Sequence, residues 1–178
     1  EYNGLGYQLG LRGEYTFRDI RMNEQGEFNI DRWDYFPTVH LSYSPGEKNQ
    51  FMASYSRRID RPRGWYFEPF ITWSDAYNVR RGNPALLPEY IGSYEMAYQR
   101  KLSETDFFST ELYYRVTNNK IERIREIYRE NIMLSTFANV GTDYALGSEI
   151  MLSMKHFDWW ESDYSGNFYN YRVQGDVF

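Results

Sequence analysis

Apolar and polar side chains alternate at every second position in several segments of this chain. In the first segment the apolar positions are Leu5, Tyr7, Leu9, Leu11, Tyr15 and Phe17. A β-strand directs successive side chains to opposite faces of its sheet, so this pattern predicts a strand with one apolar and one polar face. The pattern recurs around 38–44, 50–58, 90–99, 108–117 and 143–154, with a weaker segment at about 162–173. The predicted fold is therefore all-β, an antiparallel up-and-down meander of about seven strands.

The connections between these segments differ in length in an ordered way. Long loops are predicted at about 18–34, 60–88 and 125–133, and tight turns at 45–49, 100–106 and 155–158. Because successive antiparallel strands reverse direction, this order gathers the long loops at one end of the sheet and the tight turns at the other. Transmembrane β-barrels of the outer membrane have this arrangement. A soluble β-sandwich can also alternate its faces, but nothing requires it to sort its loops by length.

The composition of the two faces also favours a barrel wall. The polar positions hold Gly, Ser, Thr and Gln with isolated charges, as the interior of a barrel does, whereas a soluble sheet commonly exposes Lys and Glu. The mean hydropathy of −0.74 does not argue against a membrane, because only every second residue of a spanning strand faces lipid. Tyrosines near the ends of the apolar faces predict an interfacial girdle, although tyrosine is also a frequent strand residue. They are Tyr15, Tyr43, Tyr55, Tyr90, Tyr98 and Tyr114.

Charge and reactive side chains exclude several classes of function. The net charge is −5 and basic residues are interspersed with acidic ones, so we expect no nucleic-acid partner. The chain has no cysteine, which excludes disulfides and thiolate metal sites. Its two histidines, His40 and His156, lie in separate segments without metal-ligand spacing. No serine has an identifiable histidine partner, so we predict no catalytic residue, no metal and no cofactor, and the protein is not expected to be an enzyme.

Several short motifs together resemble the barrel domain of TonB-dependent outer-membrane receptors, and most of all the outer-membrane protein β-barrel family. The motifs cover most of the chain in family order: Tyr7 to Tyr15, Ser56 to Pro62, Glu68 to Phe70, Gly82 to Glu95, Tyr113 to Arg115, Lys120 to Arg123, Asn139 to Gly141 and Gly147 to Glu149.

The resemblance implies a large barrel of about 22 strands in the cell outer membrane, surrounded by lipid, filled by a plug domain and energised through the TonB system. It also implies uptake of a small nutrient of the siderophore, glycan, peptide or vitamin class. The chain departs from this pattern because it lacks a plug, lacks a TonB-contact segment near Glu1 and has about a third of the expected strands. We therefore expect residues 1–178 to form a single, incomplete barrel domain that is a piece of a longer protein.

Seven strands would leave two open sheet edges. Unpaired backbone groups cost several kcal/mol each in lipid, so this piece is not expected to span a membrane alone. We expect either a curved open sheet that associates edge to edge with a second copy, or a locally rearranged soluble sheet.

The long loop at 60–88 is the candidate binding element. Its aromatic residues offer rings that stack on sugars or heterocycles, and its arginines can grip carboxylate or phosphate groups. The competing interpretation is that these side chains pack the loop onto itself and onto the barrel rim. The candidate ligand-binding residues are Arg58, Arg61, Trp65, Tyr66, Trp73, Tyr77, Arg80 and Arg81.

Two other functions remain open at this point. The first is a soluble, aromatic-rich carbohydrate-binding β-sandwich, and the second is a structural barrel without a transport role. The charged stretch from Glu122 to Glu130 could form a short helix through pairs spaced four residues apart. We interpret it instead as the polar end of the fifth strand running into a solvated loop.

Overall fold

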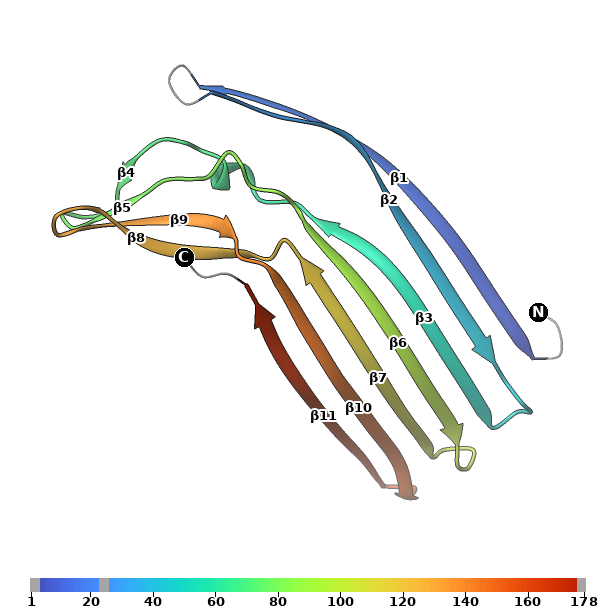
Figure 1. Cartoon of the computed structure of the whole chain (residues 1–178). Coiled ribbons are helices and arrows are strands. Elements are labelled where there is room, and N and C mark those ends of the chain that lie inside the picture. Colours follow the sequence, from blue (N-terminus) through green and yellow to red (C-terminus); the bar gives the residue numbers. More distant parts are fainter. Residues whose placement is uncertain (1–3, 23–25, 176–178) are drawn as a thin grey trace.

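A computed structural model describes residues 4–22 and 26–175, and most of them form one curved, open sheet (Figure 1). Its seven strands lie in chain order, each antiparallel to the next, which confirms the predicted meander. They are β1 (Leu5–Met22), β2 (Gly26–Tyr43), β3 (Asn49–Asp60), β6 (Glu89–Lys101), β7 (Phe107–Asn118), β10 (Thr142–Phe157) and β11 (Trp160–Gln174). We call this sheet the wall. In the described part of the chain, β1 and β11 are its open edges.

A second, smaller sheet lies at one end of the wall. It has the order β4 (Thr72–Trp73), β5 (Asn78–Arg80), β9 (Ile132–Asn139) and β8 (Ile121–Arg129), and the β5–β9 pair is parallel. A 3₁₀ turn, η1 (Gly64–Tyr66), precedes β4. No helix among the described residues is long and apolar enough to cross a membrane.

Two of the predicted loops are wrong. Most of 18–34 belongs to β1 and β2, which pair continuously from Leu5↔Tyr43 to Met22↔Gly26; residues 23–25 lie outside the described part. The stretch 125–133 belongs to the β8–β9 hairpin, which turns at Asn131 with φ of 60°. Both segments carry charged side chains on both faces of the strand instead of one apolar face, so their sequences resemble those of a loop. Residues 60–88 contain η1, β4 and β5 within an otherwise irregular segment.

The register assigns the alternating side chains of the wall to two faces. Tyr7 lies opposite Leu41, and Tyr55 opposite Tyr94, so the apolar positions share one face across the strands. This apolar face is uncovered, with Leu9 70% and Leu11 73% exposed. A soluble sandwich would bury such a face against a second sheet. The single-layered wall therefore does not favour the sandwich, and it fits a sheet whose apolar face meets lipid.

Aromatic side chains form cross-strand pairs on the apolar face. Phe51 packs against Tyr98 and Tyr55 against Tyr94, each with ring centroids 4.8 Å apart, and Tyr15 lies 5.6 Å from Trp33. Contacts of this kind contribute about 0.2–1 kcal/mol each to strand pairing. They strengthen the register of a sheet that has little buried core.

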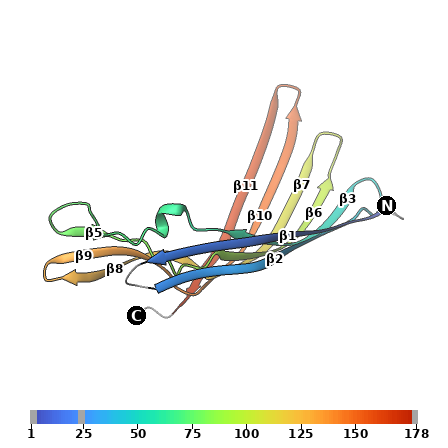
Figure 2. The same ribbon diagram turned by 90° about the horizontal axis from the view of Figure 1, so that it is seen from above.

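The two ends of the wall differ as the loop lengths predicted, except at the β1–β2 connection, which is short. Tight turns join β2 to β3, β6 to β7 and β10 to β11 at one end, and the segment 61–88 and the β8–β9 hairpin lie at the other. Figure 2 shows β5, β8 and β9 gathered at the end of the strands away from these tight turns. We call the segment 61–88 together with β8 and β9 the rim.

Gly147 gives a test of the polar face of the wall. A Cβ at this position would lie 2.4 Å from the Tyr113 hydroxyl, whose ring crosses the glycine so that the hydroxyl donates to Asn167 Oδ1. We expect Gly147→Ala to lower the free energy of unfolding by about 1–3 kcal/mol, because the ring must leave its site. Denaturant unfolding followed by tryptophan fluorescence measures this. Gly92→Ala is the control, since its nearest neighbour is the Tyr94 ring at 3.9 Å; equal losses for both variants would contradict the assignment.

Candidate functional site

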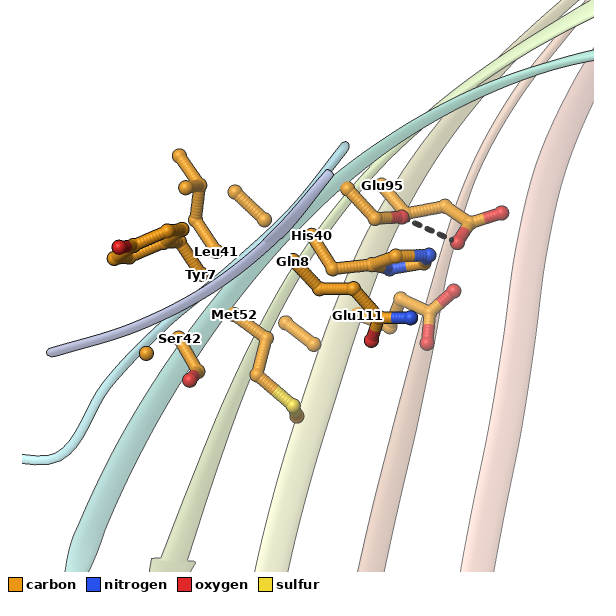
Figure 3. A pocket seen from close by; sticks show the side chains of 12 residues that line it. Tyr7, Gln8, His40, Leu41, Ser42, Met52, Glu95 and Glu111 are labelled. Carbon is orange, nitrogen blue, oxygen red and sulfur yellow. Dashed lines mark hydrogen bonds between the residues drawn. The ribbon is translucent and has the colours of Figure 1, made fainter. Parts of the chain in front are cut away.

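The polar face of the wall forms a shallow hollow of about 450 Å³. Figure 3 shows Gln8, His40, Glu95 and Glu111 pointing into it, while Tyr7 points to the opposite side of the wall. The Ser54 hydroxyl donates to Glu95 Oε2 at 2.9 Å. The hollow offers hydrogen-bonding groups, and no group of three or more potential metal ligands occurs in the described residues.

The segment 61–88 folds back on itself at a narrow neck. Gly82 N–H donates to the Glu68 carbonyl at 2.7 Å, and Asn83 N–H donates to the Tyr66 carbonyl at 2.6 Å. A Cβ on Gly82 would lie within 2.7 Å of three backbone atoms of the other arm. Only glycine permits this approach, so the Gly82-Asn83-Pro84 motif holds the loop closed.

Two asparagines fasten this closed loop to the β8–β9 hairpin. Asn83 Nδ2 donates to the Phe137 carbonyl at 2.9 Å. Asn139 pairs with both backbone groups of Leu87: its Oδ1 accepts from the N–H at 2.9 Å and its Nδ2 donates to the carbonyl at 3.0 Å. Leu86 lies between these ties and is completely buried. The loop and hairpin therefore form one packed unit.

The base of the rim is a buried ionic group. Glu89 Oε1 accepts from the Ile121 N–H at 2.7 Å, and Lys120 Nζ lies 3.4 Å from Glu89 and 3.9 Å from Asp143. Burial alone would lower the pKa of Lys120, but the two carboxylates outweigh it and raise the pKa above its ordinary value. Lys120 stays charged, and it links the starts of β6, β8 and β10.

Arginines attach the rim to the extended β1–β2 hairpin. Arg61 donates to Glu14 Oε2 at 2.7 Å, and Arg18 donates to the Leu86 carbonyl at 2.9 Å while lying 4.1 Å from the centre of the Phe67 ring. These contacts surround a cavity of about 250 Å³. The hairpin needs them because pairing between β2 and β3 stops at Thr38↔Ser56.

Tyr90 bridges β2 and the rest of the wall beyond the point where the pairing between β2 and β3 stops. Its hydroxyl donates to Asp34 Oδ1 at 2.8 Å and accepts from Arg32, and Arg57 lies 4.9 Å from the centre of its ring. This tyrosine was expected in an interfacial girdle. It holds the hairpin to the wall instead.

The eight residues predicted from the sequence to bind a ligand have several roles. Arg61 ties the loop to β1, and Arg58 lies on the polar face within 3.4 Å of the Ser93 hydroxyl. Trp73 and Tyr77 are exposed near the β4–β5 turn. Arg80 pairs with Ser135 in register, and Arg81 lines a different cavity of about 390 Å³. Trp65 and Tyr66 pack on Phe137 of β9, and Arg80 and Arg81 lie beside Ser135 of the same strand. Arg58 and Arg61 instead contact β6 and β1.

The rim also contains residues that the sequence reasoning missed. Tyr66 stacks on Phe137 with centroids 3.9 Å apart, and Trp65 meets the same ring edge-on at 5.2 Å. Arg123 pairs with Phe137 and Arg125 with Ser135 across β8 and β9. The available signal is the alternation of charge sign along β8, a stretch that we interpret from the sequence as the polar end of the fifth strand and a solvated loop.

The sequence matches a family model described as the outer membrane protein beta-barrel family over residues 1–178. No curated protein matches the chain in sequence.

Solved structures of similar fold include the siderophore receptor PirA from Pseudomonas aeruginosa, with a TM-score of 0.71, 14% identity and coverage of 92% of this chain and 34% of that one. A double mutant of the Serratia marcescens hemophore receptor HasR, solved with the hemophore HasA and heme, has a TM-score of 0.64, 15% identity and coverage of 93% and 30%. The copper transporter OprC has a TM-score of 0.59 and 15% identity, and the match covers 94% of this chain and 26% of that one. The chain thus spans about a third or less of these structures, and the likeness shows the fold.

Asn139 tests whether the rim is one unit. We expect Asn139→Ala to expose the Leu87 amide to hydrogen exchange and to destabilise the rim by about 1–3 kcal/mol, because both backbone groups of Leu87 lose their partner. Exchange measured by mass spectrometry reports on the segment. Asn139→Asp keeps the acceptor and loses the donors, so we expect an intermediate effect; unchanged protection in both variants would refute the tie.

Proposed function

Because the chain belongs to the outer membrane protein beta-barrel family and is located in the cell outer membrane, we propose that it is the wall segment and outer rim of a TonB-dependent receptor that takes up a small nutrient. The polar face lines the lumen, the apolar face meets lipid, and the rim faces the outside of the cell. The observation that carries this proposal is the placement of 61–88 and the β8–β9 hairpin at one end of a single-layered wall, with tight turns at the other.

The similar structures support the receptor assignment. They are a siderophore receptor, a hemophore receptor and a copper transporter, and this chain spans about a third or less of each. We infer that the edges of β1 and β11 pair with further strands of a larger barrel, and that a plug domain couples it to the TonB system. Edge-to-edge association with a second copy is the alternative way to satisfy these edges.

Neighbouring residues of β6 test the orientation of the wall. Glu95 and Met96 lie on opposite faces, and the chain has no cysteine of its own. We expect Glu95→Cys to react in outer membranes with a charged, water-soluble maleimide, because the lumen is aqueous. We expect Met96→Cys to resist that reagent and to react with an apolar maleimide dissolved in lipid. Equal labelling of both cysteines from water would contradict a lipid-facing wall.

Energy-dependent uptake tests the receptor function. We expect a strain without the gene that encodes this chain to lose growth on one limiting nutrient, and a plasmid copy to restore it. We also expect an uncoupler that collapses the proton gradient to stop accumulation while leaving surface binding intact. Accumulation that persists without the gradient, or growth that is unaffected across siderophores, glycans, peptides and vitamins, would overturn the proposal.

A further inference from the structure

The small sheet of the rim has two chemically different faces. Val79 and Leu134 pair in register and are buried, so the face that carries them is covered. The alternate positions form the opposite face, where Arg80, Ser135 and Arg125 stand side by side across β5, β9 and β8. Arg80 and Arg125 are both exposed.

The exposed face carries three arginines beside the exposed apolar side chains of Ile127 and Met133. Arg123 and Arg125 lie two residues apart on β8, a spacing of about 7 Å, and Arg80 lies two strands from Arg125, a spacing of about 10 Å. The acidic residues of β8 occupy the other face, because Glu122 pairs with Ala138 and Glu126 with Leu134. Within the described residues, none of these three arginines makes an ion pair, as is true of most arginines of the chain.

Aromatic rings border this basic row. Phe137 lies next to Arg123 in register and is fixed by the stacked Tyr66. Trp65 stands edge-on to the same ring and remains 43% exposed. The pairing of Phe137 in a strand ladder and its stacking on Tyr66 hold the Trp65 ring against Phe137, whose cross-strand neighbour is Arg123, before any ligand binds. We call the following six residues the basic-aromatic face: Arg80, Arg123, Arg125, Trp65, Tyr66 and Phe137.

We propose that the basic-aromatic face binds a planar small molecule that carries two or more anionic groups. Guanidinium groups pair with carboxylate, phosphate or sulfonate oxygens, often through two parallel hydrogen bonds, and the exposed Trp65 ring stacks on a flat ligand. A neutral glycan would use the ring but would leave three arginines without an anionic partner. This inference rests on the proposed receptor function and names the class of its cargo.

Fluorescence titration with pyranine, a planar aromatic trisulfonate, tests the inference on the full-length protein in detergent. We expect saturable binding that weakens with added salt, and a loss of about tenfold or more in affinity for Arg125→Gln and for Arg80→Gln, because each removes a charge-assisted contact. Arg129→Gln is the matched control. The register places Arg129 opposite Ile132, beyond the shift at Ile127, and its guanidinium lies over Tyr128. We expect its affinity to stay within twofold of the wild type.

Two further probes separate the parts of the proposal. Citrate is a trianion without a ring, and riboflavin is planar and neutral; we expect both to bind more weakly than pyranine. Citrate binding as tightly as pyranine would overturn the planar requirement, and riboflavin binding as tightly would overturn the anionic one. Pyranine affinity that is equal in the wild type and both arginine variants would overturn the site. Energy-dependent uptake that persists in those variants would leave the receptor function standing while the basic-aromatic face is rejected.

Discussion

Each strand of the wall must satisfy its backbone in the plane of the sheet while its side chains face two different environments. In a sheet of one layer, no second layer shields the apolar side chains. The buried apolar residues in the described chain are Phe36, Val79, Leu86 and Leu134, and only Phe36 belongs to the wall. The wall therefore depends on its hydrogen-bonded ladder, its cross-strand aromatic pairs and lipid on its apolar face. Its strict alternation follows from this dependence, because a shift of one residue would exchange the two faces.

The far part of the β1–β2 hairpin and the rim are held by polar contacts and a separate small core. The β1–β2 hairpin continues after β3 has diverged, and polar contacts from Arg18, Arg61 and Tyr90 hold it in place. The rim has its own small core at Val79, Leu86 and Leu134, closed by asparagine ties to backbone groups. Because the exposed side chains of the rim lie outside these ties, they can change without loss of the ladder. Variation in cargo is therefore compatible with a constant wall.

The alternation of apolar residues was sufficient to predict the seven strands of the wall, their antiparallel order and the separation of tight turns from the long segments. The alternation failed to predict strands in the segments that do not contribute to the apolar face of the wall. At 18–34 and in β8 charged side chains occur on both faces of the strand, so hydrophobic period carries no information about extended structure there. The candidate site was predicted in part for a related reason. Trp65, Tyr66 and Arg80 belong to one aromatic and basic segment of the sequence. Their neighbours on β8 and β9 are distant in sequence and join them through the parallel β5–β9 pairing and the contacts of Trp65 and Tyr66 with Phe137.

Charge replaces hydrophobicity as the ordering pattern in β8. Glu122 and Glu126 lie on the side of the buried Leu134, whereas Arg123 and Arg125 lie on the exposed side with Phe137. Like charges on one face of a strand repel one another and are unfavourable unless an opposite charge meets them. A fold selected for stability alone would gain by mixing the signs, as β1 does when Arg12 pairs with Glu14. Because positive and negative side chains of β8 lie on opposite faces, its positive face has no opposite charge beside the fixed Phe137 ring. An anion that binds from outside supplies that opposite charge.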